Sequence, residues 1–392
     1  MEIVKYDHNG RGITYLNDKI VFVPNTIIGE DVDIKIVLEK KNFIEASVIK
    51  FNKKSDIREK NICPYYNICG GCDIMHLPYF EQLKFKQNKI TEIINKFYGG
   101  KVIIKDIVYD KQYNYRNKVS LKVLNKVGYY KKNSHDIINI DECMLLDEDI
   151  NKLIKKLNKI DLGNNKNIVI RRNTSGLMLV LEKEINYNLI KNDVNSIYLN
   201  NKKIYGDDLY EDLNGLKFVI SPLSFFQVNK YNTINLYNKI LDYCNLSGNE
   251  VVLDLYCGTG TIGSFVSKKC SKVIGIEINE DAVKDANKNK EINNLNNIEF
   301  ICGDSGKILK NNKYKNIDIV IVDPPRSGLS DLSINEIINI NPKKIIYTSC
   351  DPVTLARDLR KLSEKYDVLE LTPVDMFPNT YHVESVCLLE RK

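Results

Sequence analysis

Residues 1–52 alternate apolar and polar positions in short runs, and turn-forming segments rich in Gly, Asn and Asp separate these runs. The runs are EIVKY, ITYL, KIVFVP, DVDIKIVL and IEASVIKF. Successive side chains of a strand point to opposite faces, so this pattern predicts five short strands that form a small β-barrel of the OB type. Such barrels bind nucleic acid, protein or no known partner, and the pattern alone does not choose among them.

Residues 53–220 have a mixed pattern. They begin with a basic, cysteine-containing segment, which a run of helical period follows, PYFEQLKFKQNKITEIINKFY, and this run ends at Gly99-Gly100. A second helix is expected near residues 147–158, among strand-like runs such as NKVSLKVL, IVIRR and LMLVLEKE. We therefore expect a central α+β domain here.

From residue 221 to residue 392, strand-like apolar runs alternate with helical stretches. The runs are VVLDLYC, KVIGIEI, IEFICGD, IDIVIVDPP, KKIIYTSC, DVLELTPVDMF and SVCLLER. Strands that alternate with helices are typical of βα units, so we expect an α/β domain with a mostly parallel sheet.

Composition narrows the class of protein. No apolar run reaches the roughly 18 residues of a membrane span, and the N-terminus lacks a basic region followed by an apolar one, so we expect a cytoplasmic protein without membrane contact. The net charge of +6 permits nucleic-acid binding without requiring it. In the cytoplasm, the ten cysteines indicate metal binding or catalysis rather than disulfides.

A glycine-rich loop, DLYCGTGTIG, ends the first expected strand of the third stretch. Gly258, Gly260 and Gly263 have the spacing G-x-G-x-x-G at the start of a helix. Glycines allow a tight turn and a close approach of a ligand to the backbone. The same spacing describes an NAD site, so by itself it leaves the ligand open.

Acidic residues at three successive strand ends favour S-adenosylmethionine over NAD. Asp254 is placed to bind the ammonium of a methionine moiety and would repel a pyrophosphate. Glu277 is placed for both ribose hydroxyls of a nucleoside, and Asp304 for the rim of an adenine pocket. The alternative for each acid is a helix N-cap or a solvated loop position. Three acids together suit a cationic sulfonium ligand better than a dinucleotide.

Cys350 is the candidate nucleophile. It lies in TSCDP at the end of the fifth strand, and open α/β sheets bind their ligands at such strand ends. The N-terminus of the following helix is expected to lower the pKa of the thiol. The alternative is a structural thiol, but the flanking Ser, Asp and Pro disfavour burial in a core.

Glu384 is the candidate base. A thiolate that adds to C6 of uracil makes C5 electron-rich enough to take a methyl group, and a base must then remove the C5 proton. Glu384 lies in PNTYHVESV, with His382 nearby, and its apolar neighbours are expected to desolvate its carboxylate and make it more basic. The alternative is a surface glutamate on an edge strand.

Five motifs together resemble those of the RNA uridine-C5 methyltransferases. They are SCDPVTLARDL around Cys350, VDPPRSG, DLYCGTGTIG, SFFQVN at 224–229 and HVESV near the C-terminus. The resemblance spans essentially the whole chain. It implies a class I, Rossmann-like methyltransferase domain over 221–392, a TRAM barrel over 1–52 and an iron–sulfur domain over 53–220. The branch with a cluster and a TRAM module acts mostly on 23S ribosomal RNA, and the tRNA-specific branch typically lacks both.

The resemblance also implies roles for single residues. Cys350 would be the nucleophile, Glu384 the proton-abstracting base and Phe225 the side chain that stacks on the extruded uracil. Gln227 and Asp323 would lie near the target base and the cofactor. The residues expected to bind S-adenosylmethionine are Gln227, Asp254, Tyr256, Gly258, Gly260, Glu277, Asp304 and Asp323.

Four cysteines form one pattern, Cys63-x5-Cys69-x2-Cys72 with Cys143 farther along the chain. Four thiolates suit either zinc or a [4Fe–4S] cluster, and the spacing alone leaves both open. The resemblance implies the [4Fe–4S] cluster, with Cys63, Cys69, Cys72 and Cys143 as its ligands. The spacing of radical-forming clusters is absent, so we expect a structural or RNA-positioning role.

RNA is the expected partner, and no obligate protein partner is evident. Aromatic and cationic residues interleave in the central domain, as surfaces that stack bases and follow a phosphate backbone require. Of these residues we expect Arg116, in YRNKV, to enter the active site. Two other functions remain: an amino-group methyltransferase, for which Arg326 replaces the aromatic residue of a D-P-P-aromatic loop, and a non-catalytic RNA-binding factor.

Overall fold

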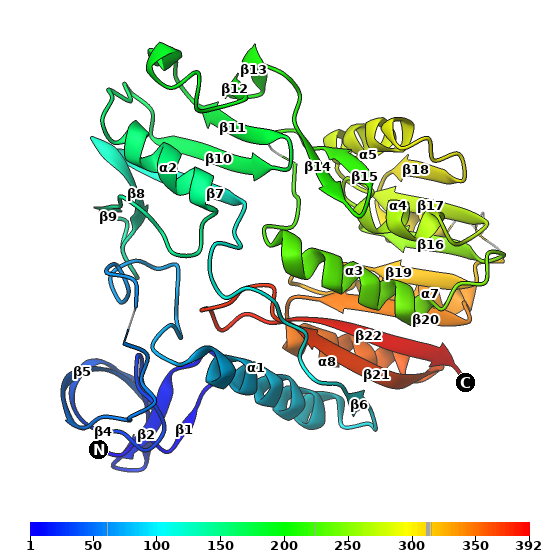
Figure 1. Cartoon of the computed structure of the whole chain (residues 1–392). Helices are drawn as coiled ribbons and strands as arrows, with labels where there is room; N and C mark the ends of the chain where they lie inside the picture. The colour runs from blue at the N-terminus through cyan, green and yellow to red at the C-terminus, as the bar shows by residue number, and fades with distance from the viewer. Residues whose placement is uncertain (61, 223, 311–313, 315) are drawn as a thin grey trace.

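The computed structural model describes residues 1–60, 62–222, 224–310, 314 and 316–392. The N-terminal sheet (blue in Figure 1) has the strand order β1-β2-β3-β5-β4. Its strands are β1 (Lys5–Tyr6), β2 (Gly12–Leu16), β3 (Lys19–Val23), β4 (Asp31–Glu39) and β5 (Phe43–Lys53). Their inward positions enclose a small core with Val21, Val23 and Val32 at its centre. The five strands expected from the alternating pattern are confirmed.

The central part of the chain forms a seven-stranded sheet of order β13-β12-β11-β10-β7-β8-β9. The strands are β7 (Lys118–Leu124), β8 (Lys126–Tyr130), β9 (Ile137–Asn139), β10 (Asn167–Asn173), β11 (Gly176–Leu181), β12 (Ser196–Leu199) and β13 (Lys202–Gly206). Helix α2 (Glu148–Leu157) lies across β10 and β7 in Figure 1. Its apolar face, with Leu153 and Leu157, packs on Leu121 and Ile168 of the sheet. The expected helix near 147–158 is confirmed.

The C-terminal sheet has eight strands in the order β18-β17-β16-β19-β20-β22-β21-β6. They are β16 (Val251–Leu255), β17 (Lys272–Glu277), β18 (Ile298–Cys302), β19 (Ile319–Val322), β20 (Lys344–Ser349), β21 (Tyr366–Val374), β22 (Glu384–Arg391) and β6 (Ile103–Ile104). Strands β16 to β20 are parallel, and β22 runs antiparallel to both of its neighbours. The expected mostly parallel sheet is confirmed.

Helices cover both faces of this sheet. On one face, α7 (Asp331–Ile340) and α8 (Pro352–Leu362) pack in a core with strand residues such as Val320 and Ile345. On the other face, α3 (Lys230–Cys244) and α4 (Thr261–Ser267) pack on Val252 and Ile321. The remaining elements are α5 (Glu280–Ile292), α6 (Ser305–Leu309), the 3-10 turn Tyr187–Leu189 and the hairpin β14 (Tyr210–Leu213) and β15 (Leu216–Val219). No helix within the described ranges has the length and apolar character needed to cross a membrane.

Two elements that precede residue 220, the expected start of the C-terminal domain, pack with the C-terminal sheet. Helix α1 (Tyr79–Ile93) continues into a π-helical turn, Ile94–Tyr98, that ends at Gly99. Its apolar residues, among them Ile90 and Ile93, belong to the same core as α8. Strand β6 pairs in parallel with β21 at the edge of the C-terminal sheet. Two elements within the range of the expected central domain therefore belong to the C-terminal layer, because their apolar faces are buried there.

A buried ion pair joins α1 to the loop between β21 and β22. Lys86 and Asp375 are both fully buried, and the Lys86 Nζ lies 2.5 Å from a carboxylate oxygen of Asp375. The hydroxyl of Tyr79 donates to the other oxygen of Asp375 at 2.9 Å, and Lys86 also donates to the carbonyl of Phe377 at 2.9 Å. Burial lowers the pKa of Lys86, and the charge of Asp375 opposes this effect. The pair is therefore well satisfied, and each partner needs the other.

Removing one partner should be costly. We expect Lys86→Met to lower the free energy of unfolding by about 3–5 kcal/mol, since it leaves the carboxylate of Asp375 buried and unpaired. Lys343→Met is the matched control, because the side chain of Lys343 is 70% exposed and its pair with Asp318 should be worth at most about 1 kcal/mol. Urea unfolding followed by circular dichroism measures both, and equal losses in the two variants would contradict the expectation.

Candidate functional site

A cavity of about 890 Å³ lies at the carboxyl ends of β16, β17 and β19. We call it the cofactor cavity. Its lining residues include Ser224, Phe225, Tyr256, Gly258, Glu277, Ile278, Asn279, Asp281, Asp285, Asp323 and Pro325. Four of the residues expected to bind the cofactor, Tyr256, Gly258, Glu277 and Asp323, are among them. This is the edge at which open α/β sheets bind ligands.

The glycine-rich loop after β16 has an unusual backbone. Tyr256, Gly258 and Gly260 all have positive φ, at 61°, 55° and 76°. A Cβ at Gly260 would lie 2.3 Å from the ring of Phe300, so packing requires glycine there. A Cβ at Gly258 would meet nothing within 4 Å, so the chain leaves open space beside this backbone. A bulky residue such as Tyr256 at positive φ is a strained feature of the kind found at functional sites.

Two acids hold this loop from different sides. Glu277 lines the cavity, and its carboxylate accepts hydrogen bonds from the backbone N–H groups of Gly258 at 3.1 Å and Asn279 at 2.8 Å. Asp254 is fully buried and accepts from the N–H of Gly263 at 2.9 Å. Burial raises the pKa of Asp254 to about 8, and its second oxygen has no hydrogen-bond partner.

The other four expected cofactor residues do not line the cavity. Asp254 lies beneath the loop, Gly260 packs on Phe300, and Gln227 is 8% exposed. Asp304 is exposed and caps α6, where it accepts from the N–H of Lys307 at 2.9 Å. Asp304 thus makes the contacts of a helix N-cap, which was the alternative to cofactor binding for this residue. For Asp254, full burial favours support of the loop over direct contact with an ammonium group.

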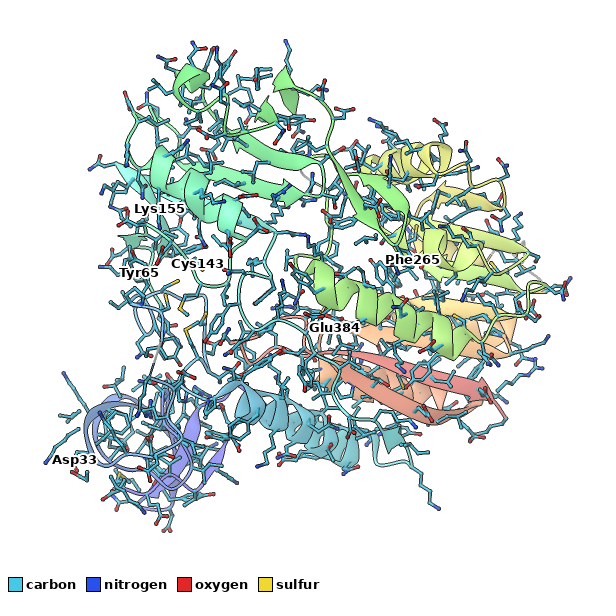
Figure 2. All side chains as sticks on the ribbon, in the orientation of Figure 1. Asp33, Tyr65, Cys143, Lys155, Phe265 and Glu384 are labelled. Carbon is cyan, nitrogen blue, oxygen red and sulfur yellow. The ribbon has the colours of Figure 1, made fainter. Side chains whose placement is uncertain are left out.

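Cys350 directly follows β20, and Glu384 is the first residue of β22, the antiparallel neighbour of β20. Ser349 at the end of β20 pairs with Ser385 of β22, so the next position on each strand is Cys350 and Glu384 respectively. Glu384 also pairs with Val374 of β21, and its side chain is buried. Figure 2 shows Glu384 where the central part of the molecule meets the C-terminal sheet. The sheet register thus brings together the expected nucleophile and the expected base.

The expectation that Cys350 has a lowered pKa is wrong. Burial, together with the charges of Glu384 and Asp323, raises the pKa of this thiol to about 11. The helix effect is weak because Asp351 caps α8 and its carboxylate already accepts from the N–H groups of Val353 and Thr354. For the pKa of Cys350, burial and two nearby carboxyl groups therefore outweigh one capped helix terminus.

The carboxyl groups of this cluster hold protons more tightly than usual. Burial raises the pKa of Glu384 well above its ordinary value, with a further contribution from Asp323, as expected for a desolvated base. Burial also raises the pKa of Asp323 to about 7. With a pKa of about 7, Asp323 exchanges protons near neutral pH, and carboxyl groups with raised pKa values are common at catalytic sites.

Arg326 is the functional candidate that the sequence analysis did not assign to the site. Its positive charge lowers the pKa of both Cys350 and Glu384, against the effect of burial. Helix α8 holds the Arg326 loop, since Thr354 donates to the carbonyl of Arg326 at 3.2 Å and Arg357 to that of Ser327 at 2.8 Å. The signal in the sequence was the position of Arg326 directly after a strand end, three residues from Asp323.

Phe225 is 70% exposed at the edge of the cofactor cavity, which suits a side chain that stacks on a ligand. The segment that carries it is held from two sides. The hydroxyl of Ser224 donates to Asp285 of α5 at 2.5 Å, and Arg171 of the central sheet donates to the carbonyl of Ser224 at 3.0 Å. Asn117 donates to the carbonyl of Val228 at 2.8 Å.

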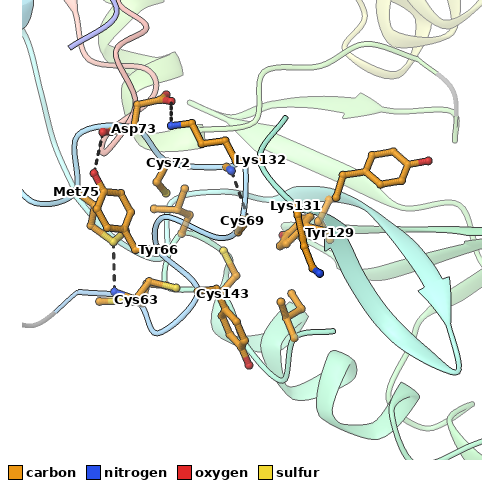
Figure 3. Close-up of a pocket in the computed structure, with 18 of the residues that line it drawn as sticks. Cys63, Tyr66, Cys69, Cys72, Asp73, Met75, Tyr129, Lys131, Lys132 and Cys143 are labelled. Carbon is orange, nitrogen blue, oxygen red and sulfur yellow. Dashed lines mark hydrogen bonds and ion pairs between the residues drawn. The ribbon is translucent and has the colours of Figure 1, made fainter. Parts of the chain in front are cut away.

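The four cysteines of the expected cluster line a second cavity of about 570 Å³. We call it the cysteine cavity, and Figure 3 shows Cys63, Cys69, Cys72 and Cys143 gathered around it. Burial and the neighbouring thiols raise the pKa of Cys63, Cys69 and Cys72. In the part of the chain that the structure describes, no three His, Cys, Asp or Glu side chains are arranged to hold a metal ion. The [4Fe–4S] cluster stays a prediction.

Arg116 lines the cysteine cavity, and its Nε donates to the carbonyl of Lys118 at 3.1 Å. It is not among the residues that line the cofactor cavity, so the structure does not place its side chain where the sequence analysis expected it. Its backbone nevertheless bridges to Asn229, at the end of the segment that carries Phe225. The segment that contains Arg116 therefore lies between the cysteine cavity and the segment that carries Phe225.

The chain is similar to known proteins over its whole length. A family model described as tRNA (uracil-5-)-methyltransferase matches residues 180–392, and a TRAM domain model matches residues 2–49. An RNA methyltransferase of Clostridium tetani is 37% identical over 97% of this chain and 93% of its own length. One of Staphylococcus aureus is 34% identical over 100% of this chain and 97% of its own.

A solved structure supports the fold. The tRNA (uracil-54, C5)-methyltransferase of Pyrococcus abyssi, crystallised in complex with S-adenosyl-L-homocysteine, has a TM-score of 0.82 and 29% identity. The match covers 99% of this chain and 98% of that one. The C-terminal sheet is therefore of the Rossmann-like methyltransferase type, and the N-terminal barrel is a TRAM domain.

The raised pKa of Cys350 is measurable by alkylation. Because only the thiolate reacts, we expect its rate with iodoacetamide to rise about tenfold per pH unit between about pH 8 and about pH 10. Arg326→Gln should slow the reaction further at each pH, since Arg326 lowers the pKa of Cys350. Peptide mass spectrometry follows Cys350, with the exposed Cys302 as the reference thiol. A rate for Cys350 that levels off below pH 8 would show that its pKa is not raised.

Proposed function

Because the chain belongs to the tRNA (uracil-5-)-methyltransferase family, we propose that it methylates C5 of a uridine in RNA through a covalent bond between Cys350 and the base. The chain is an S-adenosylmethionine-dependent RNA methyltransferase, as the family and the solved relative indicate. The covalent mechanism rests mainly on one observation: the sheet register sets Cys350 beside Glu384. Asp323, which lines the cofactor cavity, is close enough to both groups to raise their pKa.

Cys350 acts first in this mechanism. Its sulfur bonds to C6 of the uracil, and the electrons of the C5–C6 double bond move toward C5 and O4. The thiol must lose its proton to react, and its raised pKa means that the free protein holds that proton at neutral pH. Arg326 favours the thiolate, while Asp323, whose pKa is raised to about 7, can accept a proton in this range.

Glu384 acts after the methyl group has arrived. S-adenosylmethionine supplies that group as an electrophilic methyl on a sulfonium, and we expect Tyr256, Gly258 and Glu277 to hold it. Glu384 then takes the proton from C5, the electron pair restores the C5–C6 double bond, and the bond from C6 to the Cys350 sulfur breaks. A buried carboxylate with a raised pKa is a stronger base than an exposed one, which suits this step.

The substrate base must leave its stack before Cys350 can reach C6. We expect the exposed ring of Phe225 to stack on the extruded uracil, since it lies at the edge of the cofactor cavity. Arg116 and the aromatic and basic residues of the cysteine cavity, such as Tyr129, Tyr130 and Lys131, would contact RNA outside the site.

We propose 23S ribosomal RNA as the substrate, on the resemblance to the branch that carries a TRAM module and a cysteine cluster. A tRNA uridine is the second candidate. The Pyrococcus abyssi relative is a tRNA (uracil-54, C5)-methyltransferase and matches 99% of this chain, including the barrel and the central sheet. The presence of a barrel and a central sheet therefore does not decide whether the substrate is ribosomal RNA or tRNA.

We propose a [4Fe–4S] cluster held by Cys63, Cys69, Cys72 and Cys143. These four thiols line one cavity, and burial, with a smaller contribution from the neighbouring thiols, raises the pKa of Cys69 and Cys72. A bound cation would offset this repulsion, because metal ligands bind as thiolates. Sulfur-only donor sets suit iron–sulfur clusters and zinc. The cluster would hold the segment around Cys72 against the one around Cys143 and would take no part in methyl transfer.

Two variants separate the covalent mechanism from the alternatives. We expect Cys350→Ala to abolish both methyl transfer and any covalent protein–RNA adduct, and Glu384→Gln to slow turnover by about 10²–10⁴-fold while the methylated adduct accumulates. Mass spectrometry of protein and RNA reads both results. Cys270→Ala is the control, since Cys270 precedes β17 at the opposite edge of the sheet. Full turnover by Cys350→Ala would favour an amino-group methyltransferase.

Methylation of purified 23S ribosomal RNA and of bulk tRNA by the wild-type enzyme, mapped by nuclease digestion and mass spectrometry, tests the substrate. Methyl uridine in ribosomal RNA alone supports the proposal, and methyl uridine in tRNA alone establishes the second candidate. Cofactor binding without transfer to either RNA would favour a non-catalytic RNA-binding role.

Anaerobic purification tests the cluster. We expect a brown protein with about four iron and four sulfide per chain, and Cys72→Ser should lose most of this iron because burial makes Cys72 a central ligand. Cys270→Ser, outside the cysteine cavity, should keep it. A colourless protein with one zinc per chain would exclude the iron–sulfur cluster.

A further inference from the structure

The loop between β21 and β22 leads directly into Glu384. Asn379 lies at its tip, is fully buried, and has a φ of 68°. This left-handed conformation is uncommon for residues other than glycine, and asparagine is among those that adopt it most readily. The position therefore suits asparagine for its backbone as well as for its amide.

Every polar group of Asn379 has a partner. Its N–H donates to the side-chain oxygen of Gln82 at 2.8 Å, and its carbonyl accepts from the N–H groups of Asp73 and Ile74 at 3.0 and 3.2 Å. Its side-chain oxygen accepts from Gln82 and Gln112, both at 3.1 Å. Its side-chain amide donates to the carbonyl of Gln112 at 3.0 Å. A buried and fully satisfied network of this kind fixes a single arrangement.

Neighbouring carbonyls of the same loop are held in the same way. Lys86 of α1 donates to the carbonyl of Phe377 at 2.9 Å, and Lys89 of α1 to that of Tyr381 at 2.9 Å. The hydroxyl of Tyr115 donates to the carbonyl of Pro378 at 3.0 Å. The loop that leads to Glu384 is thus bound along its length by donors from other parts of the chain.

Three segments that are each more than 250 residues from Asn379 in the sequence meet at this residue. One follows Cys72, the second is α1, and the third contains Gln112 and leads into the central sheet. Glu384 follows five residues later and is the first residue of β22. Residues 381–383 lie outside any strand, so the loop contacts fix the approach of the chain to Glu384 together with the buried side chain of Val383 and the pairing of Glu384 with Val374.

We propose that Asn379 is a positioning residue for proton abstraction: it holds the loop that sets the Glu384 carboxylate against the base bound to Cys350. This inference rests on the proposed role of Glu384. Asn379 touches neither the RNA base nor the methyl donor in this account. Its loss should therefore leave the first two steps nearly intact and slow the third, because a misplacement of about 1 Å costs a reaction step about 10²-fold.

Asn379→Gly is the first test, since glycine keeps the left-handed backbone and removes only the amide. In single-turnover experiments we expect methyl transfer within about threefold of the wild type, release of the methylated RNA slowed about tenfold or more, and accumulation of the methylated adduct. Asn341→Gly is the matched control: Asn341 has a φ of 57° and ends α7 away from the site, so both rates should be unchanged. Equal slowing of transfer and release would overturn the proposal.

If Asn379→Gly fails to fold, which urea unfolding reports, Gln82→Ala removes two of the hydrogen bonds of Asn379 and should give the same selective loss. A double variant provides the second test. In a Glu384→Gln background, Asn379→Gly should slow release no further, because it acts through Glu384. Additive losses would mean that Asn379 acts independently of the base. If Glu384→Gln alone releases its product normally, the proposed function fails rather than the positioning role.

Discussion

The ion pair between Lys86 and Asp375 is the constraint on which the position of the Glu384 loop depends. It joins two segments 289 residues apart in a fully buried setting, where an unpaired charge would be prohibitively costly. Asp375 begins the loop that ends at Glu384, and Lys86 lies on the helix that extends from the cysteine segment. The pair thus fixes the C-terminal sheet relative to the N-terminal half of the chain before any RNA binds.

The edge of the sheet next to this loop carries three groups whose pKa values are raised. Burial raises the pKa of Cys350, Glu384 and Asp323. The carboxyl groups of Glu384 and Asp323 raise the pKa of Cys350 further, and Arg326 of the neighbouring loop opposes this effect. A site that keeps its thiol protonated until a substrate arrives limits unwanted oxidation or alkylation of that thiol, because the thiolate is the reactive form. The carboxyl group of Glu384, which hinders ionisation of the thiol, is also the proposed base that removes the C5 proton. The same group therefore affects the first and the last step of the proposed reaction.

Local patterns predicted most of the fold. The five strands of the barrel, the helix near 147–158 and the parallel strands of the C-terminal sheet each follow from short runs of residues. Long-range contacts were beyond such patterns. The helical run that forms α1 was expected in the central part of the chain, yet its apolar face packs in the C-terminal core, and the pairing of β6 with β21 was not predicted. The site divides similarly. Cys350 and Glu384 follow from motifs, whereas the pKa of Cys350 depends on carboxylates from other strands, and the burial of Asp254 depends on the helix packed above it. The local signal for Arg326 was its place after a strand end, three residues from Asp323, whereas Asn379 has no local signal that separates it from ordinary loop residues.

The central claim is that Cys350 and Glu384 act in sequence on one uracil, and 5-fluorouridine tests it most directly. Fluorine replaces the C5 proton that Glu384 must remove, so an enzyme of this mechanism is trapped as a covalent complex after methyl transfer. Incubation of the wild-type protein with fluorouridine-containing RNA and S-adenosylmethionine should yield a one-to-one complex, linked at Cys350 and carrying one added methyl group. A complex linked at another residue, or product release without any covalent complex, would contradict the account.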